Sequence, residues 1–154
     1  MATVRQLDLN KYSGEWYEIA KYPFRYQTDC DRAKAIYNVG PNNQLLVENQ
    51  CWLDNELIRS RTATATIPNH NQPGKLKIMF DGFPRDPTPG DYWVHWTDYN
   101  TAIVGGPSGK MLWWLSREPT VLASDVEPML KLIRSYGYDT ERLMASHPSV
   151  VRKY

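Results

Sequence analysis

Cysteine, histidine and long apolar runs are scarce in this 154-residue sequence. It contains two cysteines and three histidines but no Cys-x-x-Cys motif or other ligand cluster, so no metal site is expected. No run of about eighteen apolar residues occurs, and we expect no membrane-spanning helix. Charge of one sign is not in excess, because 18 Lys and Arg face 17 Asp and Glu. The formal net charge of +1 argues against nucleic acid as a partner and leaves at most a transient membrane contact.

An apolar leader is not evident either, since the N-terminal sequence MATVRQLDLNKYSGEW lacks the hydrophobic segment of a signal peptide. We expect an extracytoplasmic location (periplasm, outer membrane or secreted) if a signal peptide was removed, and a cytoplasmic one otherwise. The length predicts a single domain over residues 1–154. We expect a monomer or a weak homodimer.

Aromatic residues are abundant instead, with six Trp, ten Tyr and three Phe making up 12% of the chain. Most of them lie in short runs bounded by Gly, Pro and Asn, which is typical of β-strands joined by tight turns. Eight strands are predicted, at residues 15–22, 34–39, 45–52, 57–67, 75–80, 92–97, 102–105 and 111–116.

The spacing of apolar residues changes from strand-like to helical only near the C-terminus, where it predicts one amphipathic helix over 124–136. Ser124, with Glu127 three residues later, resembles a capping box at the start of this helix. Pro128 is tolerated because we place it in the first turn. Gly137 follows the last helical residue and can end the helix.

The eight predicted strands follow one another through short turns, as in an antiparallel meander. Closure lets such a sheet bury one face without exposed edges, and eight strands leave an interior wide enough for one small ligand. The predicted fold class is therefore all-β: an eight-stranded antiparallel up-and-down β-barrel with one C-terminal α-helix packed outside. The longest irregular stretch, residues 81–90 with three prolines, is predicted to form a stiff loop at the barrel rim.

The two cysteines, Cys30 and Cys51, flank a predicted hairpin turn at 41–43. In that hairpin the numbers of facing residues sum to about 84, which places Cys51 opposite Ala33. Cys30 is about three residues out of register, so a disulfide requires the chain to bend there. The spacing leaves both a disulfide and two reduced thiols open.

Three short motifs occur in a specific order and spacing: Gly14-Glu15-Trp16 in the first strand, Thr97-Asp98-Tyr99 after the sixth, and Arg117 after the eighth. On these motifs the chain resembles the lipocalins, a family of calycin β-barrels, from about Leu7 to Pro148. It looks most similar to the branch that contains bacterial outer-membrane lipocalins, plant temperature-induced lipocalins and apolipoprotein D.

The resemblance implies structural roles for the motif residues. In lipocalins the tryptophan of the first motif, here Trp16, lies across the closed end of the barrel with the late arginine, here Arg117, stacked on it. A guanidinium over an indole ring contributes on the order of 1 kcal/mol. Asp98 is expected to accept bonds from backbone amides of its own turn. We expect these residues to hold the fold rather than to catalyse a reaction.

Strand alternation, anchored on Trp16 and guided elsewhere by the resemblance, predicts which residues line a ligand cup. Apolar walls with a few polar groups are typical of a site for a small hydrophobic molecule. The predicted ligand-binding residues are Ala20, Tyr22, Ala35, Tyr37, Asn49, Arg61, Ala63, Ile78, Phe80, Trp93, His95 and Trp113. Arg61 is expected to meet a carboxylate or phosphate, or else to pair with Glu18 inside the barrel. His95 is expected to be a hydrogen-bonding wall residue rather than a metal or haem ligand.

The resemblance implies non-catalytic binding, with transport or storage, of a small hydrophobic ligand such as a fatty acid, a lysophospholipid or a similar lipid; no cofactor is expected. Three alternatives stay open. One is a tetrapyrrole or carotenoid carrier, suggested by the aromatic content and the single cup histidine. Another is an isomerase-like enzyme that uses Glu18, Tyr37, Arg61 and His95 for acid–base chemistry. The third is an interaction module whose own side chains fill the barrel.

Overall fold

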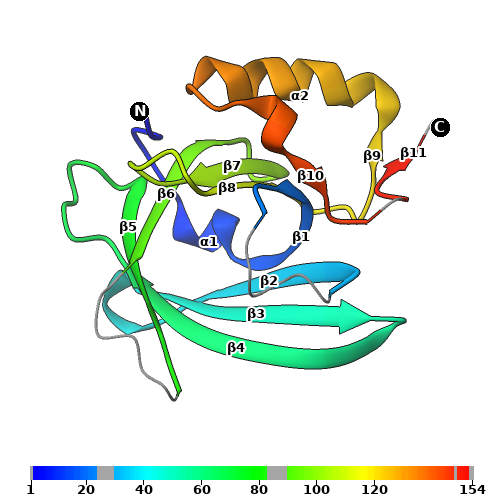
Figure 1. Cartoon of the computed structure of the whole chain (residues 1–154). Helices are drawn as coiled ribbons and strands as arrows, with labels where there is room; N and C mark the ends of the chain where they lie inside the picture. The colour runs from blue at the N-terminus through cyan, green and yellow to red at the C-terminus, as the bar shows by residue number, and fades with distance from the viewer. Residues whose placement is uncertain (1, 24–29, 83–89, 148, 153–154) are drawn as a thin grey trace.

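The computed structural model describes residues 2–23, 30–82, 90–147 and 149–152, and within them the main strands close into a ring (Figure 1). Each strand from β1 to β8 pairs antiparallel with the next, and β1 also pairs with β8. The strands are β1 Gly14–Lys21, β2 Arg32–Val39, β3 Leu45–Leu53, β4 Glu56–Thr66, β5 Lys75–Phe80, β6 Gly90–Thr97, β7 Thr101–Gly105 and β8 Leu112–Ser116. The predicted up-and-down barrel is confirmed, with every strand within two residues of its expected bounds. Most of the predicted rim loop, residues 83–89, lies outside the described residues.

Side chains that point toward the barrel axis form an inner core. Burial of one large apolar side chain contributes about 1.5–3 kcal/mol, so this alternating inward face is what stabilises the closed sheet. The inner core contains Trp16, Ala35, Tyr37, Leu45, Val47, Ala63, Ala65, Leu76, Tyr92, Val94, Ala102, Val104 and Leu115, with Leu9 and Tyr12 from the N-terminal segment.

A second core lies outside the ring, under helix α2 (Ala123–Ser135). Figure 1 shows α2, in yellow and orange, running along the same side of the barrel as β7 and β8. Ile133 is fully buried and belongs to the same cluster as Ile103 of β7 and Trp114 of β8. The predicted C-terminal helix packed outside the barrel is therefore confirmed.

The start of α2 differs from the prediction. The helix begins at Ala123 because the preceding residues form the short strand β9 (Val121–Leu122), which pairs with β11 (Val151–Arg152). Leu122 is the N-cap and makes no side-chain cap bond, so the predicted capping box is wrong. Pro128 consequently lies in the second turn and not in the first. Gly137 ends the helix in the left-handed region (φ +94°), as predicted.

A β-bulge in β1 reverses the direction of its last side chains. The register shifts between Glu18 and Ala20. Glu18 lies opposite Leu115, a residue of the inner core, whereas Ala20 lies opposite Trp114, a residue of the outer core. A bulge inserts one extra residue, so the alternation that starts at Trp16 is inverted beyond it.

A second β-bulge in β6 has the same effect. The register shifts between Val94 and Trp96, so that Val94 faces Val104 inside the ring and Trp96 faces Ile103 outside it. Strict alternation counted back from Thr97 would have placed the odd-numbered residues of this strand inside. The structure places the even-numbered Tyr92 and Val94 there instead.

Several short elements were not predicted. Helix α1 (Leu9–Tyr12) lies at one end of the barrel, and the Asp8 side chain caps it by accepting bonds from the amides of Asn10 and Lys11 (Figure 1). The 3-10 turn η1 (Pro41–Asn43) joins β2 to β3. After α2 come the 3-10 turn η2 (Thr140–Arg142) and strand β10 (Met144–Ala145), which pairs with the end of β1.

Cys30 and Cys51 form a disulfide, with their Cα atoms 5.3 Å apart. The hairpin register is the predicted one, with Ala33 opposite Cys51. The chain still follows β3 before β2 begins, because the Asp31 amide donates to the carbonyl of Trp52 (2.9 Å). This keeps Cys30 beside β3 and allows the bridge that the spacing left open.

Candidate functional site

One end of the barrel is closed by Arg117. Its guanidinium carbon lies 3.9 Å from the centroid of the Trp16 ring. Its nitrogens donate to three backbone carbonyls, those of Tyr99 (3.0 Å), Glu15 (2.9 Å) and Lys11 (2.8 Å). Arg117 therefore joins three separate segments over a fully buried tryptophan, which is a structural task.

Gly14 of the first motif is required by backbone conformation and by space. Its φ of +103° lies in the region that side chains rarely adopt. A Cβ atom added there would approach an Arg117 nitrogen to 3.2 Å. The glycine thus allows the arginine to reach across the closed end.

The turn at Thr97-Asp98-Tyr99 is held by its own polar side chains. One Asp98 carboxylate oxygen accepts bonds from the amides of Asn100 (2.9 Å) and Thr101 (2.7 Å). The Thr97 hydroxyl donates to the Thr101 carbonyl (2.8 Å) and accepts from the Tyr99 amide (2.9 Å). These bonds explain why the motif combines two short polar residues, and they match the role predicted for Asp98.

The inner wall meets solvent toward the opposite end of the barrel. Asn49, Ile78, Phe80 and Trp113 are half-buried and Arg61 is exposed, whereas alanines form much of the wall between them. This distribution makes the solvent-reached end of the inner face the candidate cup, above the packed end. The predicted ligand-binding residues that do lie on the inner face are Ala35, Tyr37, Asn49, Arg61, Ala63, Ile78, Phe80 and Trp113.

Ala20 and Tyr22 do not line the cup, so their predicted orientation is wrong. Both belong to the outer core, because the bulge in β1 precedes them. The Tyr22 hydroxyl donates to the carbonyl of Asp139 (3.0 Å) and accepts from its amide (2.8 Å). Arg142 lies over the Tyr22 ring at 4.4 Å. Tyr22 thus fixes the segment that follows α2.

Trp93 and His95 are likewise outside the barrel, and their predicted place in the cup is wrong. Trp93 lies under the ammonium group of Lys75, 4.6 Å from its ring centroid. His95 Nδ1 is 2.6 Å from the carbonyl oxygen of Ala2, and Nε2 is 2.6 Å from the Tyr138 hydroxyl. Since a carbonyl only accepts, Nδ1 carries the proton and Nε2 accepts from Tyr138. Burial lowers the pKa of His95.

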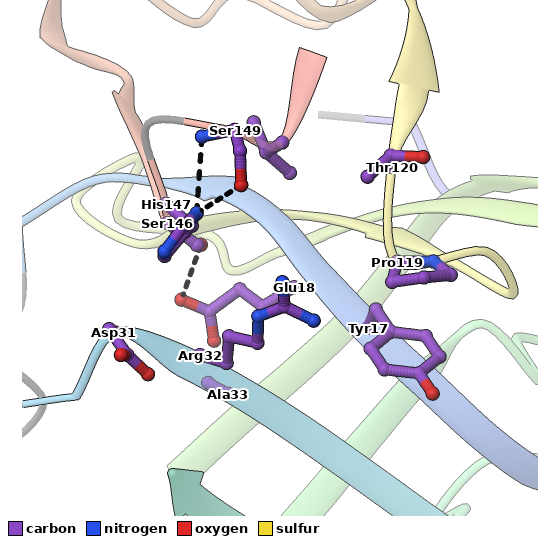
Figure 2. A pocket seen from close by; sticks show the side chains of 11 residues that line it. Tyr17, Glu18, Asp31, Arg32, Ala33, Pro119, Thr120, Ser146, His147 and Ser149 are labelled. Atoms are coloured by element: carbon purple, nitrogen blue, oxygen red, sulfur yellow. Dashed lines mark hydrogen bonds between the residues drawn. The ribbon is translucent and has the colours of Figure 1, made fainter. Parts of the chain in front are cut away.

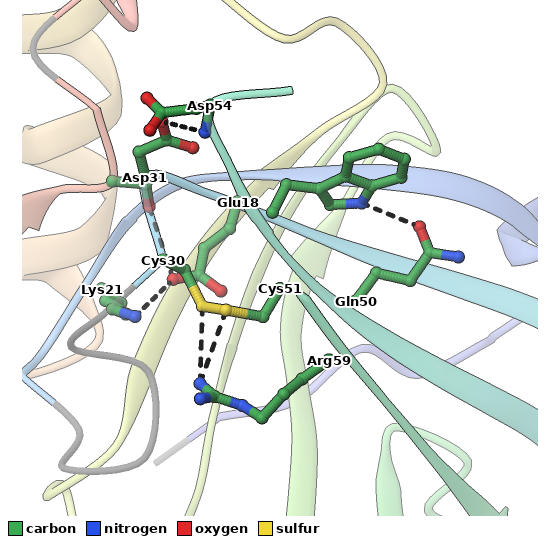
Figure 3. The surroundings of a disulfide bond; sticks show 10 residues. Glu18, Lys21, Cys30, Asp31, Gln50, Cys51, Asp54 and Arg59 are labelled. Carbon is green, nitrogen blue, oxygen red and sulfur yellow. Dashed lines mark hydrogen bonds and ion pairs between the residues drawn. A yellow bond between two sulfur atoms is a disulfide. The ribbon is translucent and has the colours of Figure 1, made fainter. Parts of the chain in front are cut away.

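Charged residues gather on the inner face near the disulfide (Figure 3). Glu18 forms an ion pair with Lys21 at 3.2 Å, and both side chains are largely buried. Burial raises the pKa of the Glu18 carboxyl, and Lys21 offsets part of that effect. Arg59 lies opposite Cys51, and its guanidinium nitrogen is 3.5 Å from that sulfur.

Arg61 is two residues from Arg59 on the same face of β4. The expected alternative of an Arg61–Glu18 pair is not formed, because Glu18 is held by Lys21. The Arg61 guanidinium instead lies 4.2 Å from the centroid of the Phe80 ring. Within the part of the chain that the structure describes, no carboxylate lies within ion-pair distance of Arg61.

Three tyrosine hydroxyls meet inside the barrel. Tyr92 of β6 lies 2.7 Å from Tyr37 of β2 and 2.6 Å from Tyr12 of α1, measured between hydroxyl oxygens. Burial raises the pKa of all three phenols. Sequence reasoning named Tyr37 but missed Tyr12 and Tyr92, since nothing in the sequence marks the bulge that turns Tyr92 inward.

Two pockets lie outside the cup. The pocket in Figure 2, between β1, the start of β2 and the C-terminal segment, has a volume of about 20 Å³ and holds no more than a water molecule. An open groove of about 370 Å³ lies over β2, β3 and β4. Its lining includes Ile36 and Leu46 but also the carboxylates of Glu48 and Asp81.

The four residues suggested for acid–base chemistry are not brought together. Within the described ranges, no hydrogen bond or ion pair joins any two of Glu18, Tyr37, Arg61 and His95, and His95 lies on the opposite face of the sheet from the other three. The described residues also contain no group of three or more His, Cys, Asp or Glu that could hold a metal ion. None of the described helices is long and apolar enough to cross a membrane.

Comparison with known proteins places this fold and its motifs in one family. The model of the lipocalin-like domain matches residues 7–148, and the chain belongs to this family. Temperature-induced lipocalin-1 of Arabidopsis thaliana is 30% identical over 149 residues, covering 93% of this chain and 80% of the relative. Outer membrane lipoprotein Blc of Vibrio cholerae is 30% identical over 145 residues, covering 92% of this chain and 82% of the relative.

A solved structure gives the same fold. Insecticyanin from the tobacco hornworm Manduca sexta superposes with a TM-score of 0.77 at 20% identity, covering 99% of this chain and 90% of that chain. The protein is therefore a lipocalin-like β-barrel, and its family supports the binding of small hydrophobic ligands.

Proposed function

We propose that this protein binds an amphiphilic lipid whose head group carries a carboxylate or a phosphate, such as a fatty acid or a lysophospholipid, and transports or stores it without chemical change. The observation that carries this proposal is Arg61, an exposed cation at the solvent-reached end of the inner wall, with no carboxylate partner in the described chain. A guanidinium binds carboxylate and phosphate oxygens well because its donors match their geometry.

The surroundings of Arg61 support an anionic head group. Lys21 and Arg59 also stand on the inner face, where Lys21 pairs with Glu18. Three cations of the described chain thus gather on this face, although the whole chain carries a formal charge of only +1. Asn49, which lies opposite Arg61 on β3, adds an amide that can bond a head-group oxygen.

The wall below these cations suits an alkyl chain. Ala35 and Ala63 leave room on β2 and β4, while Ile78, Phe80 and Trp113 supply apolar surface. Apolar area removed from water contributes about 25 cal/mol per Å², so a long tail gains affinity here without specific contacts. The outer groove over β2, β3 and β4 fits this ligand less well, because Glu48 and Asp81 repel an anionic head.

The disulfide supports an extracytoplasmic location of the protein. Cys30 and Cys51 are joined, and disulfides persist mainly in oxidising compartments. The relative from Vibrio cholerae is named as an outer membrane lipoprotein. Alkylation of free thiols at the moment of cell lysis tests this point, since a bridge present in the cell leaves no cysteine to modify.

The test of the head-group assignment is a tryptophan-fluorescence titration with oleate, a lysophospholipid and the uncharged oleyl alcohol. Arg61→Ala should weaken oleate and lysophospholipid binding about three- to tenfold, the effect of one charge-assisted bond at an exposed site. It should leave oleyl alcohol unchanged. Arg32→Ala, which removes an exposed cation from the outer face of β2, is the matched control.

Two results would contradict the proposal. Equal oleate affinity in wild type and Arg61→Ala rejects the role of Arg61. Failure of all the lipids to bind wild type rejects the lipid carrier itself. The pigment-carrier alternative is weakened because His95, the histidine that suggested it, lies outside the barrel. A coloured protein on purification would still favour a pigment over a lipid as the ligand.

A further inference from the structure

A chain of tyrosine hydroxyls crosses the barrel from wall to wall. Tyr37 stands on β2 and Tyr92 on β6, which are four strands apart in the ring of eight and so face each other across its axis. Their hydroxyl oxygens are 2.7 Å apart, and Tyr12 extends the chain by a second contact of 2.6 Å to Tyr92. The Tyr37 and Tyr12 rings stack at 5.3 Å, which fixes the two ends of the chain beside each other.

The three tyrosine hydroxyls carry one proton more than the hydrogen bonds among them engage. Three hydroxyls carry three protons, whereas two hydrogen bonds among them engage only two. The described residues offer no third partner within bonding distance of these oxygens. Since burial raises the pKa of all three phenols, each keeps its proton at neutral pH. One of the three O–H groups therefore always lacks an acceptor among these hydroxyls, and it is the Tyr37 O–H when Tyr12 donates to Tyr92 and Tyr92 donates to Tyr37.

The Tyr37 end is the one that can face a ligand. Tyr12 is 0% exposed and packs on Trp16 at the closed end, with ring centroids 5.2 Å apart. Tyr37 and Tyr92 keep 3% and 8% exposure. The next inward residue on β2 toward the cup is Ala35, whose side chain is a single methyl group.

We propose that the Tyr37 hydroxyl is a second polar recognition point, which donates a hydrogen bond to an oxygen acceptor far along the ligand tail. The proposal rests on the proposed function, in which the head group lies at Arg61. The ligand class becomes an oxygenated fatty acid or lysophospholipid, with an anionic head and a carbonyl or hydroxyl oxygen on the buried chain. A plain alkyl tail would leave the buried O–H without a partner, which is unfavourable.

The experiment compares dodecanoic acid with 11-oxododecanoic acid, which places a ketone near the end of the same chain. Wild type should bind the oxo acid about three- to tenfold more tightly, the effect of one buried hydrogen bond. The preference should fall in Tyr37→Phe and vanish in Tyr37→Phe combined with Tyr92→Phe, because Tyr92 alone can still donate from a displaced position. Tyr17→Phe, whose ring lies under Lys34 on the outer face at 5.1 Å, should keep the full preference.

Infrared spectroscopy of the bound, ¹³C-labelled ketone measures the frequency of its carbonyl stretch. This frequency would not change if Tyr37 had only a structural role. The carbonyl stretch should shift to lower frequency in wild type and return toward its unbonded value in the double variant, while near-ultraviolet circular dichroism checks that the variants are folded. An oxo-acid preference that is absent in wild type, or undiminished in the double variant, overturns the inference while leaving dodecanoate binding and the proposed function intact. Failure of both acids to bind wild type overturns both.

Discussion

Arg117 lies over Trp16, with its guanidinium carbon 3.9 Å from the centroid of the indole ring. The same guanidinium donates to carbonyls in α1, at the start of β1 and in the turn between β6 and β7. Arg61, by contrast, contacts one ring, that of Phe80, on a wall that solvent reaches. The two ends of the barrel thus use arginine differently, one to lock the fold and the other, as we propose, to receive a ligand.

Replacement of Arg117 should destabilise the barrel without a direct effect on the cup. Arg117→Ala removes the stack on Trp16 and three charge-assisted bonds, and we expect the free energy of unfolding to fall by about 2–4 kcal/mol. Arg117→Lys keeps the charge but not the three-way geometry of the guanidinium, so the free energy of unfolding should fall by less than in Arg117→Ala. Urea denaturation measures both changes. A midpoint unchanged in Arg117→Ala would show that the closed end does not depend on this residue.

Reduction of the disulfide should also lower stability. Cys30 and Cys51 are separated by 21 residues along the chain, and a bridge over a loop of this size contributes about 3 kcal/mol. The Cys30→Ala/Cys51→Ala variant should therefore unfold at a lower urea concentration than wild type. A reducing agent should lower the midpoint of wild type and leave that of the double variant unchanged. Equal sensitivity of both proteins to the reductant would contradict the assignment.

Acidification should weaken the attachment of the segment after α2. Burial lowers the pKa of His95 below its unfolded value of about 6.5, so between the two values the unfolded chain binds more protons. Stability from the neutral ring is therefore complete above about pH 6.5 and is lost as pH falls through the folded pKa. His95→Gln should flatten the pH dependence of the unfolding free energy between pH 5 and 7. An identical slope in both proteins would contradict this role.

Two tryptophans should report differently on a bound ligand. Trp113 faces inward opposite Val104, whereas Trp93 lies on the outer surface under Lys75. Trp113→Phe should remove much of the fluorescence change that oleate causes, and Trp93→Phe should leave it largely intact. The reverse pattern would place the ligand outside the barrel, against the corrected orientation of β6.

Strand positions could be predicted from this sequence because turn residues and alternating aromatics mark each strand. Side-chain orientation could be predicted only up to the first bulge. Ala20 and Tyr22 were placed inside by counting from Trp16, and the extra residue in β1 turns them out. The bulge in β6 does the same to His95. Bulges depend on how neighbouring strands meet around the ring, which one strand's sequence does not show.

The orientation of the residues on the cup wall could be predicted better than the polar contacts that those residues make. Ala35 and Asn49 lie on the inner face as expected, because no bulge falls between them and the turn at 41–43 that sets their register. Arg61 and Ala63 also face inward, although a bulge at Cys51 and Trp52 separates them from the turn between β3 and β4. The partner of Tyr37 was beyond prediction, since Tyr12 enters from a one-turn helix and Tyr92 from the far wall. Contacts between such distant segments follow only from the closed barrel.

The most direct test of lipid binding is native mass spectrometry of the protein as purified, followed by solvent extraction and identification of what is released. We expect a complex with one small lipid that carries a carboxylate or phosphate and dissociates under denaturing conditions. An empty protein whose tryptophan fluorescence also fails to respond to added fatty acids and lysophospholipids would contradict it.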